Sequence, residues 1–146
     1  MIRIIIISLL ECLLMACSAT SQTSQDTIVQ YQYYFDKQLN DTIYIKVDIP
    51  PVYTGSSRTL SGFIFKNLEV PNQEKPQTKL YFSFIVTKEG NVVKAKVPNK
   101  NEQDYTLLEI RIIELISKSS SWKPAVFQRR SVSAETSLPL HIDYAY

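Results

Sequence analysis

Residues that most often carry catalysis or bind metals are scarce in this sequence. It has one histidine, two cysteines and three glycines among 146 residues. Glycine-rich phosphate loops and nucleophile elbows require glycines at fixed spacing, and neither pattern occurs. Cys12 and Cys17 lie five positions apart in an apolar run with no histidine nearby, which does not fit a zinc site. We therefore expect a protein that is not an enzyme and that holds no metal or cofactor.

A strong charge of one sign is also missing. The net charge is +2, and charged residues make up 21% of the chain. No dense basic run with interleaved aromatics occurs, so we expect no nucleic-acid partner. The length fits one domain with tails, and a domain of this size can bury a core without disulfides.

The first segment, residues 1–16, is predicted to be a signal peptide. Arg3 precedes an apolar run from Ile4 to Met15, which is shorter than the roughly 20 residues of a membrane-spanning helix. The run ends in Leu14-Met15-Ala16-Cys17, which resembles a bacterial lipobox. The resemblance implies cleavage before Cys17 and acylation of that cysteine. The alternative is an ordinary secretory signal with an incidental cysteine. Residues 17–27 are rich in Ser, Thr and Gln and are predicted to be a flexible tether.

The most regular pattern in the chain runs from Lys79 to Val97 and predicts a β-hairpin. Apolar residues alternate with others on both sides of a turn at Lys88-Glu89-Gly90-Asn91. One face of the first strand carries Leu80, Phe82, Phe84 and Val86. A lone hairpin is not stable in water, so this face needs helices and a further strand to cover it.

A second hairpin is predicted at residues 28–49, before this core. Residues 28–35 and 42–49 are rich in β-branched and aromatic residues, and a polar turn separates them. Tyr33 and Phe35 share one strand face. That face either forms an interaction surface or fills a half-buried strand.

Two helices are predicted around the central hairpin. The first begins after Ser56 or Ser57 as N-cap and ends before Pro71. The second begins with a capping box between Thr106 and Glu109 and ends at residues 119–121.

The last elements are a turn at Trp122-Lys123-Pro124-Ala125 and a strand from Ser131 to about Tyr144. Trp122 is expected to pack over the end of the second helix as a structural anchor. Pro139 lacks a backbone N–H, which indicates that the last strand lies at a sheet edge or carries a bulge.

Together these elements predict an α+β fold for residues 50–146. A three-stranded antiparallel sheet is packed by two helices in the order helix, strand, strand, helix, strand, and the hairpin at 28–49 is an N-terminal extension. This order resembles the C-terminal domain of the TonB family, in the form common in Bacteroidetes-type bacteria. The matching segments are Pro51-Val52-Tyr53-Thr54-Gly55, Phe63-Ile64, Asn67-Leu68 with Pro71, Phe84-Ile85-Val86 with Gly90 and Val92, Glu109 with Arg111, Trp122-Lys123-Pro124-Ala125 and Leu138-Pro139-Leu140.

The resemblance implies a binding function. In this family the domain receives a short extended peptide of an outer-membrane transporter, which adds as a strand to the sheet edge. An open edge offers unpaired backbone groups for such an addition. The expected binding edge comprises Ser131, Val132, Ser133, Ala134, Glu135, Thr136 and Ser137.

Three questions stay open at this point. The extra hairpin at 28–49 could already cover that edge, and a second copy of the chain could occupy it instead of a transporter. The expected protein is a periplasmic lipoprotein anchored in the outer membrane that binds a protein partner. The alternative is a structural envelope lipoprotein that binds cell wall or lipid through Arg129 and Arg130.

Overall fold

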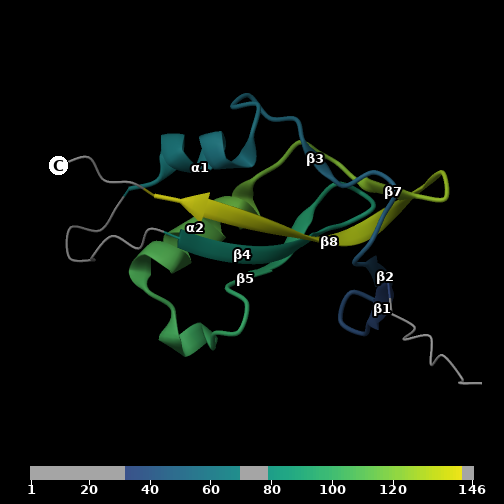
Figure 1. The fold of residues 1–146 in the computed structure, drawn as a ribbon, viewed down its shortest axis with the longest axis horizontal. Coiled ribbons are helices and arrows are strands. Elements are labelled where there is room, and N and C mark those ends of the chain that lie inside the picture. Colours follow the sequence, from purple (N-terminus) through teal and green to yellow (C-terminus); the bar gives the residue numbers. More distant parts are fainter. Residues whose placement is uncertain (1–31, 70–78, 143–146) are drawn as a thin grey trace, which may run out of the picture. The chain divides into compact units, whose positions relative to one another are not determined.

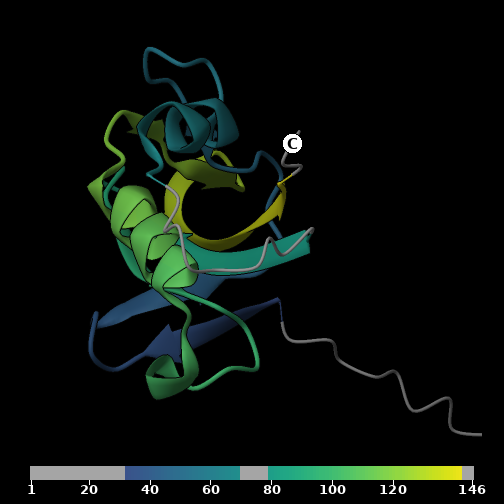
Figure 2. The same cartoon turned by 90° about the vertical axis from the view of Figure 1, so that its left-hand side faces the viewer.

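The described part of the chain contains a six-stranded sheet, a two-stranded sheet and two α-helices (Figure 1). This computed structural model describes residues 32–69 and 79–142. The strands of the six-stranded sheet are β1 (Tyr33–Asp36), β2 (Asp41–Tyr44), β4 (Lys79–Val86), β5 (Val92–Lys96), β7 (Ala125–Phe127) and β8 (Arg130–His141). Their order is β1-β2-β8-β4-β5, with β7 also paired to β8. Figure 2 shows how strongly β8 curves.

The central hairpin is confirmed as the strands β4 and β5. They pair antiparallel, and Gly90 takes the positive φ of 83° that the turn between them requires. Leu80, Phe82, Phe84 and Val86 are all buried in the core, as the alternation predicts. Hence the period-2 pattern identified the two strands and the face of β4 that joins the core, but it did not show that Ser83 and Ile85 on the other face are buried as well.

Two helices cover that apolar face. Helix α1 (Leu60–Asn67) buries Leu60 and Ile64, and its N-cap is Thr59 rather than Ser56 or Ser57. Helix α2 (Leu107–Lys118) buries Leu108, Ile112 and Ile116, and follows a short 3₁₀ helix, η2 (Glu102–Asp104). The capping box between Thr106 and Glu109 is present as predicted.

The Trp-Lys-Pro-Ala segment forms strands as well as a bend. Trp122 and Lys123 are β6 (Trp122–Lys123), which pairs antiparallel with β3 (Val52–Tyr53). Ala125 begins β7, which turns back through Gln128 and Arg129 into β8. These strands of two and three residues are too short to show a periodic pattern in the sequence.

The predicted fold class was wrong, because the sheet has six strands instead of three. The N-terminal hairpin is paired into it: β2 runs parallel to β8, with Ile43 opposite Ser133 and Tyr44 opposite Ala134. Ile43 is fully buried by this pairing. Alternation predicts that a segment is a strand but does not identify its partner, so the sequence could not show that the hairpin extends the sheet.

Candidate functional site

The expected binding edge lies on β8, which has neighbours along its whole length. Val132 and Ser131 pair with β7, and Ser133 and Ala134 pair with β2. From Ala134 to His141 the strand is also paired antiparallel with β4. Therefore β8 lies between β2 and β4 in the strand order, and the edge expected at residues 131–134 is paired with β7 and β2, whereas residues 135–140 are paired, among the described residues, only with β4.

The second half of β8 is paired differently from the first half, because the chain diverges from β8 after Tyr44, at the end of β2. The N–H groups of Ile45 and Lys46 donate to the carbonyl of Gln32, at 2.7 and 3.4 Å. Those of Asp48 and Ile49 donate to the carbonyl of Val126, at 3.0 and 3.1 Å. Within the described ranges, no strand other than β4 pairs with residues 135–140 of β8.

The register of Pro139 shows which backbone groups of β8 face away from β4. It lies in register with Tyr81 of β4, and because its nitrogen carries no hydrogen, that pair is of the non-hydrogen-bonded kind. Alternate residues of an antiparallel strand direct their backbone groups to opposite sides. Ser137 therefore presents its N–H and C=O, and Pro139 its C=O, to the side away from β4.

A groove lies beside these groups, where the chain after β2 diverges from β8. Its volume is about 450 Å³. We call it the outer groove, and its lining residues are Ile45, Val47, Pro50, Pro51, Ser83, Glu135, Thr136 and Ser137. One wall is apolar, and Ile45 there is 58% exposed. The other wall is the β8 segment whose backbone groups face outward.

Glu135 lies between this groove and a second, more polar pocket. That pocket, of about 400 Å³, is lined by Tyr34, Asp36, Ser83, Ile85, Lys94, Lys96 and Glu135. The Glu135 carboxylate accepts hydrogen bonds from Ser83 Oγ at 2.5 Å and from the Tyr34 hydroxyl at 3.3 Å. Burial, together with the adjacent Glu135 charge, raises the pKa of Tyr34 to about 12. These contacts hold the β1–β2 hairpin against the β4–β8 face.

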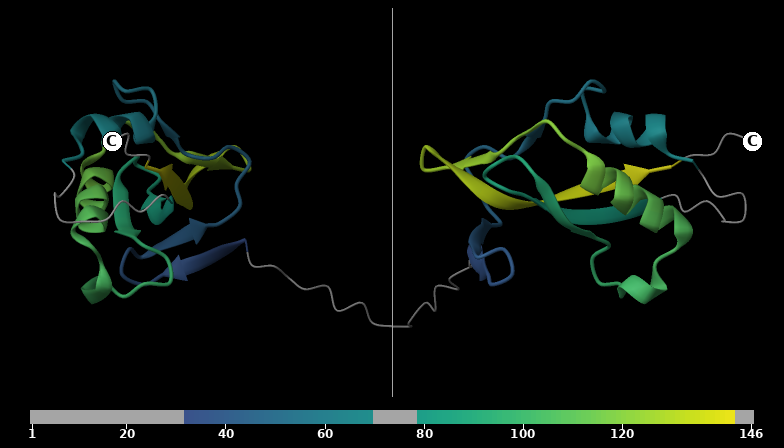
Figure 3. Two further views of the ribbon diagram at one scale, coloured as in Figure 1. Left: turned by 60° about the vertical axis from the view of Figure 1, so that its left-hand side comes forward. Right: turned by 180° about the vertical axis from the view of Figure 1, so that it is seen from behind.

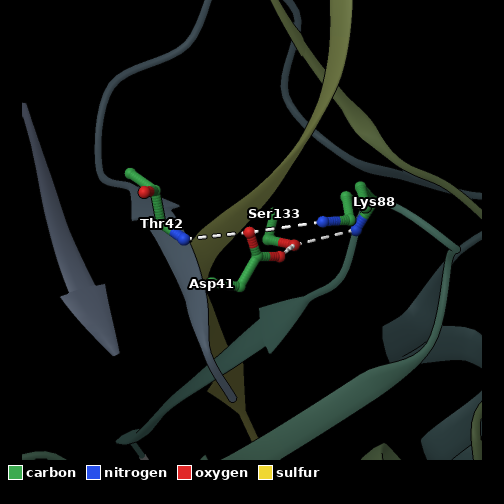
Figure 4. Close-up of polar contacts among 4 residues, drawn as sticks. All are labelled: Asp41, Thr42, Lys88 and Ser133. Atoms are coloured by element: carbon green, nitrogen blue, oxygen red, sulfur yellow. Dashed lines mark hydrogen bonds and ion pairs between the residues drawn. The ribbon is translucent and has the colours of Figure 1, made fainter. Parts of the chain in front are cut away.

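A polar cluster at the junction of β2, β4 and β8 has the residue types of a nucleophile site (Figure 4). Ser133 Oγ donates to Asp41 Oδ2 at 2.7 Å and accepts the Lys88 N–H at 2.9 Å. Asp41 Oδ1 accepts the Thr42 N–H at 2.9 Å and lies 3.4 Å from Lys88 Nζ. Burial opposes the charge of Asp41, but the Ser133 and Thr42 bonds and Lys88 lower its pKa.

This cluster joins strands and does not present a reactive group. Ser133 is 1% exposed, and its hydroxyl already donates one hydrogen bond and accepts another. A nucleophile needs access to substrate and an adjacent base to take its proton. Asp41 is ionised, but its acceptor sites hold β2 and the turn after β4 in place. The geometry therefore fits a structural junction.

Three of the four residues in the Trp122-Lys123-Pro124-Ala125 segment are at least half-buried. Trp122 Nε1 donates to Ser119 Oγ at the end of α2, at 3.1 Å. Its ring contacts Phe84 and Tyr53 edge-on, with centroid distances of 5.5 and 5.4 Å. Ala125 is fully buried, Pro124 is half-buried and Lys123 is exposed. The placement of Trp122 as an anchor over the end of α2 agrees with the prediction.

Some of the expected features fall on residues that the structure does not describe. Cys17 and the signal segment lie outside the described residues. Among residues 32–69 and 79–142, no helix is long and apolar enough to cross a membrane. Those same residues hold no cluster of three or more potential metal ligands.

No protein-family model, curated protein or solved structure matches the chain.

Sequence reasoning missed most of the outer groove. The alternation in residues 42–49 predicted a strand through Ile49, whereas β2 ends at Tyr44. The wall formed by Ile45, Val47 and the two prolines exists only because the chain diverges there. Pro50-Pro51 marks where a ladder must end, since consecutive prolines cannot continue one, but the chain leaves β8 already after Tyr44.

Proposed function

We propose that this protein is a non-enzymatic periplasmic lipoprotein that binds an extended peptide by strand addition in the outer groove. The peptide pairs with β8 at Ser137 and flanking carbonyls, on the side away from β4. This position overlaps the expected segment at residues 135–137, extends to Pro139, and excludes residues 131–134, whose edge is occupied.

One observation carries the proposal: β2 stops pairing with β8 after Ala134 and leaves a groove beside outward-facing backbone groups. Main-chain hydrogen bonds supply affinity in strand addition, and pockets for alternate side chains supply selectivity. The apolar wall of Ile45 and Val47 provides such a pocket for apolar side chains of the peptide.

The resemblance to the TonB C-terminal family supports the nature of the partner. In that family the added strand belongs to an outer-membrane transporter. A lipid anchor at Cys17 would hold the domain in the envelope, where it can meet such a peptide. A second copy of the chain is the competing partner, because it too offers extended segments.

A displayed library of extended peptides with alternating apolar residues provides the probe. We expect selected peptides to bind the parent and the Ser137→Ala variant equally, because the side chain is not used. Ser137→Pro removes the N–H and should abolish binding. Ser137 is exposed, so thermal denaturation should show that both variants remain folded.

Binding of the selected peptides should also depend on the apolar wall of the outer groove. Ile45→Asp places a charge on its apolar wall and should weaken binding more than tenfold, whereas Tyr81→Asp, at an equally exposed position of β4, should not. Binding that survives Ser137→Pro would contradict the proposal. Selection of peptides that bind equally to all variants would locate the partner surface elsewhere.

A further inference from the structure

The β1–β2 hairpin exposes the face that carries Tyr33 and Phe35, while its other face, which includes the buried Ile43, packs toward the sheet. In the register of the hairpin, Tyr33 lies opposite Tyr44 and Phe35 opposite Thr42, so these residues share a face. Tyr33 is 56% and Phe35 58% exposed. The other face carries Tyr34, Asp36 and Asp41, which bind Glu135, Lys94 and Ser133. The hairpin therefore leaves two large aromatic rings exposed on one face and buries Ile43 on the other.

Two half-buried rings connect Tyr33 to the end of β7, next to the turn between β7 and β8. Ring centroids lie 5.7 Å apart for Tyr33 and Tyr44, and 5.0 Å apart for Tyr44 and Phe127. Phe127 is the cross-strand partner of Arg130, so their side chains share a face. We call Tyr33, Phe35, Tyr44, Phe127, Arg129 and Arg130 the aromatic–arginine surface.

Both arginines are available to an external partner. Arg129 and Arg130 are exposed, and no ion pair of either occurs among the described residues. The Asp48 carboxylate accepts the Gln128 N–H at 2.8 Å and so holds the turn in place. Figures 1 and 3 show this turn at the same end of the sheet as the β1–β2 hairpin.

We propose that the aromatic–arginine surface docks on the headgroup region of an anionic lipid bilayer. Tyrosine and phenylalanine rings partition into the membrane interface, and arginines are attracted by anionic headgroups. This inference is separate from the peptide site, since it uses neither the outer groove nor the outward groups of β8.

The position of the surface along the chain favours a bilayer as its occupant. Tyr33 lies sixteen residues after Cys17, so the intervening chain reaches at most about 55 Å even when fully extended. An acyl anchor at Cys17 would therefore keep this end of the domain close to the membrane. A single weak membrane signal gives reversible binding, and a second one stabilises it.

Vesicle sedimentation tests the proposal on the chain from residue 17 onward with Cys17→Ala, so that no acyl chain contributes. We expect binding to phosphatidylglycerol vesicles and much weaker binding to phosphatidylcholine vesicles. Arg129→Gln with Arg130→Gln should lower the partition coefficient about fivefold per arginine. The matched control is Lys66→Gln with Lys118→Gln, which removes the same charge from exposed positions on α1 and α2.

The aromatic part has its own control. Tyr33→Ser with Phe35→Ser should reduce binding at high salt, where the electrostatic part is screened. Tyr81→Ser, at 59% exposure on β4, should leave it unchanged. Equal partition of all variants would overturn the proposal. The proposal would also be overturned if the parent co-sedimented with peptidoglycan and the arginine variant lost this co-sedimentation but still bound vesicles. The surface would then bind cell wall and not lipid.

Discussion

Asp36 and Lys94 join the first and last strands of the six-stranded sheet. Their ion pair, with 2.5 Å between Lys94 Nζ and Asp36 Oδ2, connects β1 to β5, which are the two ends of the strand order. The Lys94 ammonium lowers the pKa of the Asp36 carboxylate, and the N–H groups of Leu39 and Gln38 contribute. The curl of the sheet is what allows its two end strands to meet.

This relationship predicts a local effect of breaking the ion pair. Lys94→Met should increase amide hydrogen exchange in β1 and β2 while leaving exchange in β4 and α2 unchanged. The hairpin pairs with β8 over only two residues, so it depends on such side-chain contacts. Lys96→Met is the control, because no ion pair of Lys96 occurs in the described part of the chain. Exchange that rises equally in both variants would contradict this role.

The Ser133 junction should contribute measurably to stability. Ser133→Ala removes a hydrogen-bond donor to Asp41 and the acceptor of the Lys88 N–H. A buried polar group left without its partner costs about 1–3 kcal/mol, which urea denaturation would detect. Ser131→Ala, at an exposed position of the same strand, should change the free energy of unfolding by less than about 0.5 kcal/mol.

Trp122 should stabilise the fold through packing. Trp122→Ala removes edge-on contacts to Phe84 and Tyr53 and the bond to Ser119, so the free energy of unfolding should fall by about 3 kcal/mol. Trp122→Phe keeps a ring but loses the indole N–H, and should cost less. An unchanged denaturation midpoint in Trp122→Ala would show that the ring does not anchor this region.

The charge of Glu109 is expected to stabilise the folded state at neutral pH but not at acid pH. Burial disfavours its charge, but Lys100 Nζ at 2.6 Å and the Thr106 N–H at 2.8 Å lower its pKa below the ordinary 4.5. A carboxyl whose pKa is lower in the folded state stabilises fully above its ordinary pKa. That stabilisation is lost as pH falls through the lowered value.

Glu109→Gln tests this contribution, because glutamine keeps the capping box but carries no charge. The variant should be less stable than the parent at neutral pH by on the order of 1 kcal/mol. The difference should shrink as the pH is lowered from 4.5. A difference that stays constant with pH would mean that the Glu109 charge does not stabilise the folded state.

The sequence predicted local features better than partners. The β4–β5 hairpin and the Thr106 capping box follow from patterns within a few residues, and both were found. The pairing of β2 with β8 joins residues ninety positions apart, and no local pattern specifies it. The polar contacts between the hairpin and the sheet were equally hidden. Tyr34 and Asp36 reach Glu135 and Lys94, which lie far from them in the sequence.

The last prediction concerns Pro139 and the side of β8 that faces away from β4. Because proline has no N–H, Ser137 is the last residue before His141 that can donate a hydrogen bond on this side. Prolines at exposed edges limit unwanted strand pairing. Pro139→Ala restores a donor and should therefore strengthen both peptide binding and self-association. Sedimentation velocity should show a concentration-dependent dimer in Pro139→Ala that is absent from the parent. The double variant Ser137→Pro with Pro139→Ala lacks the neighbouring donor and should return to the parent's behaviour. A Pro139→Ala protein that neither associates nor binds peptides more tightly would show that this side of β8 is closed to added strands.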